Sequence, residues 1–175
     1  MVSLLLLIDG YNVIAPVAAP RGRGETRWLQ RERMQLIERL AKHLDPAVRS
    51  RTCVVFDAAN PPRDRPSQFE VEGIDVRFSV GYSEADDLLE ELIAAHSAPK
   101  GLAVVSSDQR VKTAASRRGC AVYESQAWLD DLLDGQVRLA AVRKGRAGQG
   151  DAQGERNEPS VGRDEVADWM REFGF

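Results

Sequence analysis

Three aspartates in the sequence each follow an apolar run. Asp9 comes directly after residues 4–8, Asp57 directly after 53–56, and Asp108 follows 102–105 with two serines between. Apolar runs without a polar break are typical of strands buried on both faces, which occur mainly in parallel sheets. Because ligands bind at the carboxyl ends of such strands, we expect the three carboxylates to lie along one edge of a sheet.

A further acidic segment opens the helix expected at 84–96. It carries Glu84, Asp86 and Asp87. Helix starts in such folds lie at the same edge as strand ends, so this segment could join the strand-end aspartates. At about 100° per residue, Asp86 borders the apolar face of the helix, Glu84 lies at the opposite border, and Asp87 points to solvent. Asp86 is therefore the favoured ligand of this helix and Glu84 the second choice.

Carboxylates gathered in a site of low dielectric repel one another unless a cation or protons intervene. Hard oxygen ligands suit Mg²⁺ or Mn²⁺. We predict a metal site built from Asp9, Asp86 and Asp108, with Asp57 and Glu84 as further ligands. Two divalent ions held there could activate water and stabilise the leaving oxygen in phosphodiester hydrolysis. Turn, capping and helix-dipole interactions are the alternative explanation for each of these acids.

Several polar residues lie near the expected acidic edge. Asn12 is interpreted as catalytic, through an amide that orients a ligand or contacts substrate. Ser107 and the serine before it could orient the next aspartate or bind a metal-bound water, and Ser107 is also assigned to RNA contact. Arg21 and Arg23 are interpreted as RNA-binding because their loop leaves the same edge. Ordinary turn chemistry and solvated surface charge are the alternatives for these residues.

The alternation of apolar runs and amphipathic segments predicts an α/β fold, Rossmann-like and doubly wound, with a mostly parallel sheet of about five strands and flanking helices. The strands are expected at about 3–8, 52–57, 74–80, 102–106 and 121–123, and the helices at about 26–44, 84–96, 109–118 and 126–134. Residues 1–140 are expected to form the domain. A Gly-, Gln- and charge-rich flexible linker over 141–160 and a short amphipathic helix over 161–175 are expected to follow.

Composition narrows the functional classes. The formal net charge is −3 and the sequence pI about 5.5, which argues against binding nucleic acid through bulk positive charge. No apolar run is long enough to cross a bilayer, and no basic leader or cleavage site is evident. The two cysteines, Cys53 in an expected strand and Cys120 at the start of another, are interpreted as buried free thiols. These features favour a cytoplasmic protein without a membrane partner.

With these residues in view, the chain resembles the YacP-like branch of the NYN domains, within the PIN-like nuclease group. The motifs that carry the resemblance, in the family's order, are Asp9-Gly10-Tyr11-Asn12, Val54-Val55-Phe56-Asp57, Glu84-Ala85-Asp86 and Ser106-Ser107-Asp108. They cover about residues 3–134, and the tail after 145 falls outside. Family members commonly carry Thr-Ala-Asp where this chain has Glu84-Ala85-Asp86, but the aspartate is kept.

The resemblance implies a PIN-like fold and a metal-dependent endoribonuclease that uses Mg²⁺ or Mn²⁺. The family's bacterial members include a ribosome-associated enzyme that cleaves mRNA, so RNA is the implied partner, and mRNA on or near the ribosome in particular. Two alternatives stay open. One is an NYN module that binds RNA or ribosomes without cutting. The other is an aspartate-based phosphatase or phosphotransfer domain, although such a domain wants a second aspartate where Tyr11 stands and a late lysine, for which Lys112 is a loose candidate.

Overall fold

The apolar run near the N-terminus forms β1 (Leu6–Asp9), an inner strand of a six-stranded sheet. The structure is a computed structural model, and it describes residues 3–14, 25–57 and 66–140. The strand order is β3-β4-β2-β1-β5-β6. The remaining strands are β2 (Thr52–Phe56), β3 (Gln68–Val71), β4 (Ile74–Phe78), β5 (Ala103–Val105) and β6 (Ala121–Tyr123). Every neighbouring pair is parallel except β3 and β4, which are antiparallel.

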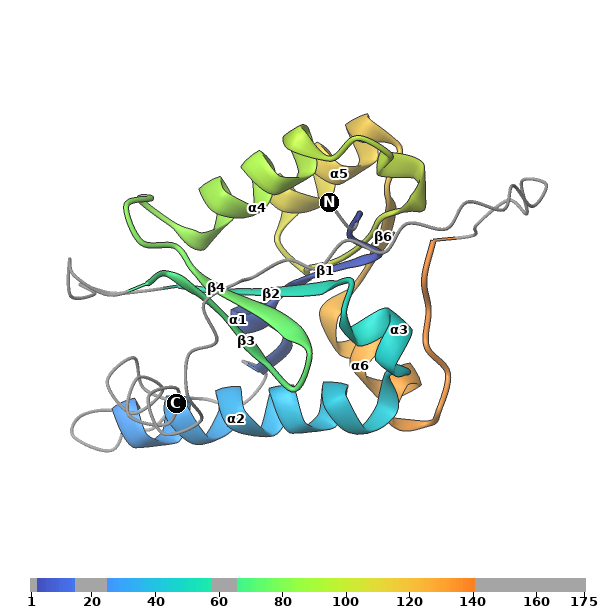
Figure 1. Cartoon of the computed structure of the whole chain (residues 1–175). Helices are drawn as coiled ribbons and strands as arrows, with labels where there is room; N and C mark the ends of the chain where they lie inside the picture. The colour runs from blue at the N-terminus through green and yellow to red at the C-terminus, as the bar shows by residue number, and fades with distance from the viewer. Residues whose placement is uncertain (1–2, 15–24, 58–65, 141–175) are drawn as a thin grey trace, which may run out of the picture.

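Helices cover both faces of this sheet (Figure 1). On one face lie α4 (Ala85–Ala95) and α5 (Gln109–Arg118), which pack against alternate strand residues such as Leu7 and Val104. On the other face α1 (Gly10–Ile14), α2 (Glu25–His43) and α6 (Ser125–Leu133) pack around Leu6 and Ile8. Two short helices, α3 (Pro46–Arg49) and η1 (Pro99–Gly101), complete the described elements. The predicted α/β class, with a mostly parallel sheet and flanking helices, is confirmed.

One strand was not anticipated. β3 pairs with β4 through a tight turn in which Glu72 and Gly73 both have positive φ, at 53° and 82°. Only Phe69 of β3 is buried, whereas Gln68 and Glu70 are exposed. So little apolar surface gives no strong strand pattern in the sequence, and glutamate is not a usual residue for a turn position with positive φ. The sheet therefore has six strands where about five were expected.

The other features of the fold bear on the remaining expectations. Cys53 and Cys120 are buried and free, as predicted. Among the described residues no helix is both long and apolar enough to cross a membrane. The expected linker at 141–160 and helix at 161–175 lie outside the described residues.

Candidate active site

Asp9 ends β1 at the carboxyl edge of the sheet, and only 2% of it is exposed. Three polar groups hold its carboxylate. The Ser106 hydroxyl donates to Oδ2 at 2.8 Å, the Asn12 side-chain amide donates to the same oxygen, and the Asn12 backbone N–H donates to Oδ1 at 3.3 Å. A buried carboxylate is tolerated where donors of this kind surround it. Asn12 therefore contacts Asp9 itself.

Gly10 allows α1 to begin directly after the strand. A Cβ atom at this position would lie 2.3 Å from Cε1 of Phe56, which is closer than real Cβ contacts come. Phe56 is itself buried in the core. The small residue next to Asp9 thus lets the chain turn against the aromatic ring and brings Asn12 back over the carboxylate.

Asp108 caps the N-terminus of α5. Its Oδ1 accepts hydrogen bonds from the backbone N–H groups of Arg110 at 2.7 Å and Val111 at 3.2 Å. Its own backbone N–H donates to the Ser106 hydroxyl at 3.0 Å. Capping, one of the two roles expected for Asp108, is therefore present. The cap uses Oδ1, and no hydrogen bond to Oδ2 is present among the described residues.

Asp86 lies in the first turn of α4 and responds to both of the other acids. Its partial burial, together with the negative charges of Asp108, Asp9 and Glu84, raises its pKa to about 6, and Arg110 opposes the shift. Within the described residues no hydrogen bond to the Asp86 carboxylate is present. The structure thus brings Asp9, Asp86 and Asp108 to the same edge, within electrostatic reach of one another.

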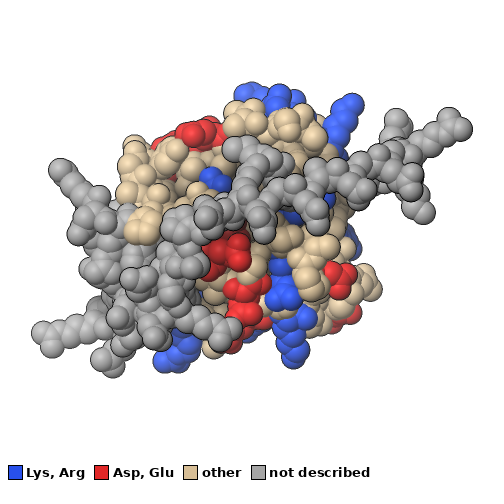
Figure 2. All heavy atoms as spheres, viewed as in Figure 1, with Lys and Arg blue, Asp and Glu red and all other residues tan. Residues whose placement is uncertain are grey.

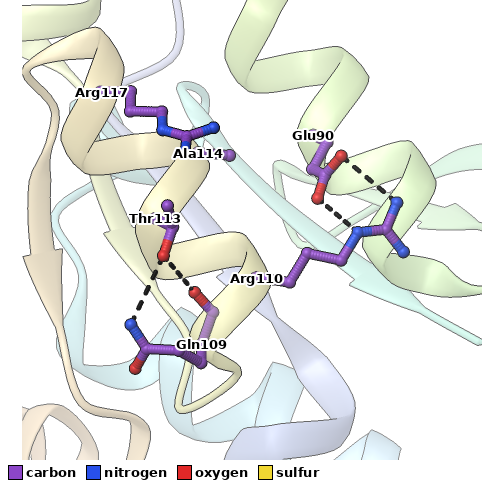
Figure 3. A pocket seen from close by; sticks show the side chains of 6 residues that line it. All are labelled: Glu90, Gln109, Arg110, Thr113, Ala114 and Arg117. Atoms are coloured by element: carbon purple, nitrogen blue, oxygen red, sulfur yellow. Dashed lines mark hydrogen bonds and ion pairs between the residues drawn. The ribbon is translucent and has the colours of Figure 1, made fainter.

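The other acids at the start of α4 turn to Arg110. Its guanidinium lies 2.6 Å from Asp87 and 3.8 Å from Glu84, and it also pairs with Glu90 at 2.6 Å (Figure 3). The ion pair holds the pKa of Asp87 below its usual range. Asp87 was expected to face solvent; it is partly exposed, and its carboxylate is paired with Arg110. Sequence reasoning missed Arg110 because the pairing depends on how α4 packs against α5.

Among the described residues, Asp57 has no hydrogen-bond partner in common with Asp9, Asp86 or Asp108. It is exposed at the end of β2, and its Oδ1 accepts a hydrogen bond from Ser79 at 3.0 Å. Arg33 donates to its backbone carbonyl at 3.2 Å. The Arg33 guanidinium stacks 5.4 Å from the ring centroids of Phe56 and Phe78, and burial lowers its pKa to about 10 while the charge of Asp57 opposes that shift. The contacts of Asp57 are thus with the β2–β4 side of the edge.

The residues assigned to RNA contact are only partly described. Ser107 is exposed in the loop between β5 and α5, and its hydroxyl accepts a hydrogen bond from the backbone N–H of Ser125 at 3.2 Å. Arg21 and Arg23 lie outside the described residues. Ser106 is fully buried and bonds to Asp9, so the two serines point to different partners.

The donor chemistry of this edge fits a hard divalent cation. Carboxylate oxygens come from Asp9, Asp86 and Asp108, and Asp86 is the one whose charge is least compensated. Across residues 3–14, 25–57 and 66–140, no three acidic, histidine or cysteine side chains are close enough to enclose an ion on their own. Mg²⁺ usually keeps several waters and takes only one or two carboxylates from a protein.

The doubly wound, mostly parallel sheet and the family comparison place the chain in the PIN-like nuclease group. Within that group, the family model of the YacP-like NYN domain matches residues 6–171, and the chain belongs to this family. The match reaches well past residue 134, so the tail that was expected to fall outside the resemblance is part of the family's pattern.

Solved structures agree on the fold. The crystal structure of Rae1 (YacP) from Bacillus subtilis matches with a TM-score of 0.54 and 22% identity, over 75% of this chain and 74% of that one. A tryptophan-to-leucine mutant of Rae1 matches with the same TM-score and 23% identity, over 75% of this chain and 76% of the other. No curated protein sequence matches the chain. At these identities the likeness concerns the fold.

Proposed function

We propose that the protein is a metal-dependent endoribonuclease that hydrolyses phosphodiester bonds within RNA. The observation that carries the proposal is the gathering of Asp9, Asp86 and Asp108 at one edge, where partial burial and the charges of the neighbouring acids raise the pKa of Asp86 to about 6. Strongly perturbed carboxylates cluster at metal sites and active sites, where acidic groups are gathered for function. Membership of a PIN-like nuclease family supports the same reaction class.

Asp86, Asp108 and Asp9 would hold Mg²⁺ or Mn²⁺. When bound, such an ion supplies a Lewis acid for the phosphoryl oxygens and a nucleophilic water at neutral pH. Asn12 and Ser106 keep the Asp9 carboxylate in one orientation through hydrogen bonds from two sides. A carboxylate held in this way needs no rearrangement when substrate arrives. Asp57 and Glu84 have other partners in the structure, so we propose at most accessory roles for them.

RNA contacts are proposed for Ser107, at the surface beside Asp108, and for Arg21 and Arg23. On the face drawn in Figure 2, acidic and basic side chains of the described residues are interspersed. Because the net charge is −3, local contacts rather than a broad basic surface would have to position the RNA.

The finer proposal is that the substrate is mRNA on or near the ribosome, in the cytoplasm. The resemblance implies it. The net charge of −3 is in keeping with it, because the ribosome, rather than a basic surface of this protein, would then present the RNA. Sedimentation with ribosomes tests this part separately. Pelleting of the protein with ribosomes, reversed by moderate salt, is the expected result.

The aspartyl phosphotransfer alternative gains no support from the site. Tyr11, which stands where that chemistry wants a second aspartate, is 52% exposed. Lys112, its candidate lysine, pairs with Glu124. The lysine is thus engaged at the start of α6, while Asp9 is surrounded by neutral donors.

Cleavage of a structured RNA with and without Mn²⁺ tests the main proposal. We expect internal cuts by the wild type only when Mn²⁺ is present, and none by Asp86→Asn. Asp130→Asn is the matched control, because Asp130 is an exposed aspartate on α6, outside the proposed site. Wild-type protein that binds RNA but makes no cuts would replace the enzyme proposal with the non-catalytic NYN module.

A further inference from the structure

Arg110 joins α5 to α4 through three carboxylates. Its Nε lies 2.6 Å from Glu90, one terminal nitrogen lies 2.6 Å from Asp87, and the other lies 3.8 Å from Glu84. A second contact to Glu90, at 3.3 Å, makes that pair bidentate. Figure 3 shows the side chain reaching across the surface between the two helices to Glu90. A planar guanidinium held on more than one side in this way has few positions left to adopt.

The partners of Arg110 surround Asp86 in the sequence. Glu84 precedes it by two residues, Asp87 follows it directly, and Glu90 comes one turn later. All three lie within ion-pair distance of Arg110, whereas among the described residues no hydrogen bond or ion pair to the Asp86 carboxylate is present. The backbone N–H of Arg110 also donates to Asp108 at 2.7 Å, so the same residue is anchored at the proposed site.

We propose that Arg110 is a positioning residue that withholds Glu84, Asp87 and Glu90 from the metal, so that Asp86 is the carboxylate that α4 presents to Asp9 and Asp108. The inference rests on the metal site of the proposed function. Glu84 and Asp87 stand in the same helical turn as Asp86 and carry the same ligand chemistry. Without a cation of their own, their oxygens would be drawn to a divalent ion nearby, and the ion would move toward them.

This role predicts opposite changes in metal affinity and in activity. Arg110→Met removes a positive charge beside the site and releases carboxylates, so Mn²⁺ should bind about threefold more tightly or better. The ion would then be held off its productive position, and RNA cleavage should fall about tenfold or more, in the range seen when the outer partners of a metal site are removed. Loss of a purely structural tie between α4 and α5 would instead weaken binding and cleavage together.

Calorimetry with Mn²⁺ and RNA cleavage, both on the full chain, test the proposal. The variants are Arg110→Met, Asp87→Asn and the two combined. Asp87→Asn alone should behave nearly as the wild type. In the combined variant, Mn²⁺ affinity should return toward the wild-type value and part of the cleavage rate should recover. Arg117→Met is the matched control, since it removes the same charge from the same helix. It should change neither the Mn²⁺ affinity nor the rate of RNA cleavage.

Weaker or unchanged Mn²⁺ binding by folded Arg110→Met, or a combined variant no better than the single one, would overturn the proposal. If circular dichroism shows Arg110→Met to be unfolded, Arg110→Lys decides. It keeps the charge but loses the bidentate fork, so Mn²⁺ affinity should stay near the wild-type value while cleavage falls. A full wild-type cleavage rate would contradict the proposal.

Failure of the proposed function gives a different result. Wild-type protein that binds Mn²⁺ without cutting RNA would overturn the proposed endoribonuclease activity, yet the calorimetry on Arg110→Met would still decide the role of Arg110. Wild-type protein that binds no Mn²⁺ would overturn both.

Discussion

The Ser106 hydroxyl joins the two strand-end aspartates of the proposed site. It donates to Asp9 at 2.8 Å and accepts from the backbone N–H of Asp108 at 3.0 Å. A serine hydroxyl has one proton to donate, and here it is committed to Asp9. Ser106 is therefore suited to hold carboxylates in place, and contact with RNA falls to its exposed neighbour Ser107.

The two adjacent aspartates of α4 should differ sharply in importance. Asp86→Asn is expected to abolish RNA cleavage, because one strong electrostatic contact in a transition state is worth ~3–4 kcal/mol. Asp87→Asn should leave most of the activity, since Asp87 pairs with Arg110. Cleavage rates of the two variants, each first shown to be folded, provide the measurement. An active Asp86→Asn beside an inactive Asp87→Asn would mean that the roles on this helix are reversed.

The raised pKa of Asp86 predicts a pH-dependent stability in the absence of metal. Folding favours the protonated form, because the pKa rises from its ordinary value of about 4 to about 6. The contribution to stability is therefore complete below about pH 4 and is lost as the pH rises through about 6. In EDTA, the melting temperature of the wild type should fall relative to that of Asp86→Asn between these limits. Parallel melting curves for the two proteins across that range would contradict the assignment.

Mn²⁺ should reverse the effect at neutral pH. A divalent ion that binds the folded state stabilises it by mass action, and its ligands must be ionised. We expect Mn²⁺ to raise the melting temperature of the wild type at pH 7 and to do so far less at pH 5. Asp86→Asn should gain little at either pH.

At the scale of elements, the junction between β1 and α1 depends on Gly10. Gly10→Ala would place a methyl group against the Phe56 ring, at 2.3 Å before any adjustment. Because Phe56 is buried in the core, we expect a loss of about 1–3 kcal/mol in the free energy of unfolding. Urea denaturation gives the value, and Gly101→Ala, where nothing lies within 4 Å of the added Cβ, is the control. Equal urea midpoints for the two variants would show that the junction accommodates the added methyl group without a steric clash.

Elements with a strong apolar period could be predicted from the sequence, and weakly patterned ones could not. β1, β2 and β5 are buried on both faces, so their runs stand out, and the helix at 109–118 was located to the residue. β3 was missed because its alternation exposes polar residues and its turn uses Glu72. The short α1 was missed as well, since five residues carry too few turns to show a helical period.

The candidate site divides along similar lines. Strand ends and one helical angle were enough to place Asp9, Asp86 and Asp108 at a common edge. The partners of Asp57 and the network of Arg110 could not be foreseen, because they depend on which strands are neighbours and how two helices pack. Local periodicity carries no information on either.

At the scale of the whole molecule, the described sheet and the proposed site both lie within residues 6–140. A chain ending at Lys144 is therefore expected to fold and to keep its basal Mn²⁺-dependent cleavage of RNA. Circular dichroism and the cleavage assay check this, with the full-length protein beside it. The family match extends to residue 171, so a folded but inactive truncation would assign the tail a part in the reaction.

The position of β1 sets the order in which the chain can fold. This strand comes before the other described strands along the chain, yet its two neighbours follow much later, with Leu6 opposite Thr52 on one side and Ala103 on the other. β1 cannot pair on both sides until β5 has left the ribosome, and pairings between such distant parts of a chain slow folding. Until then an apolar strand is exposed along one edge, which is where nascent chains aggregate. Synthesis interrupted between β4 and β5 should therefore leave a product that depends on chaperones.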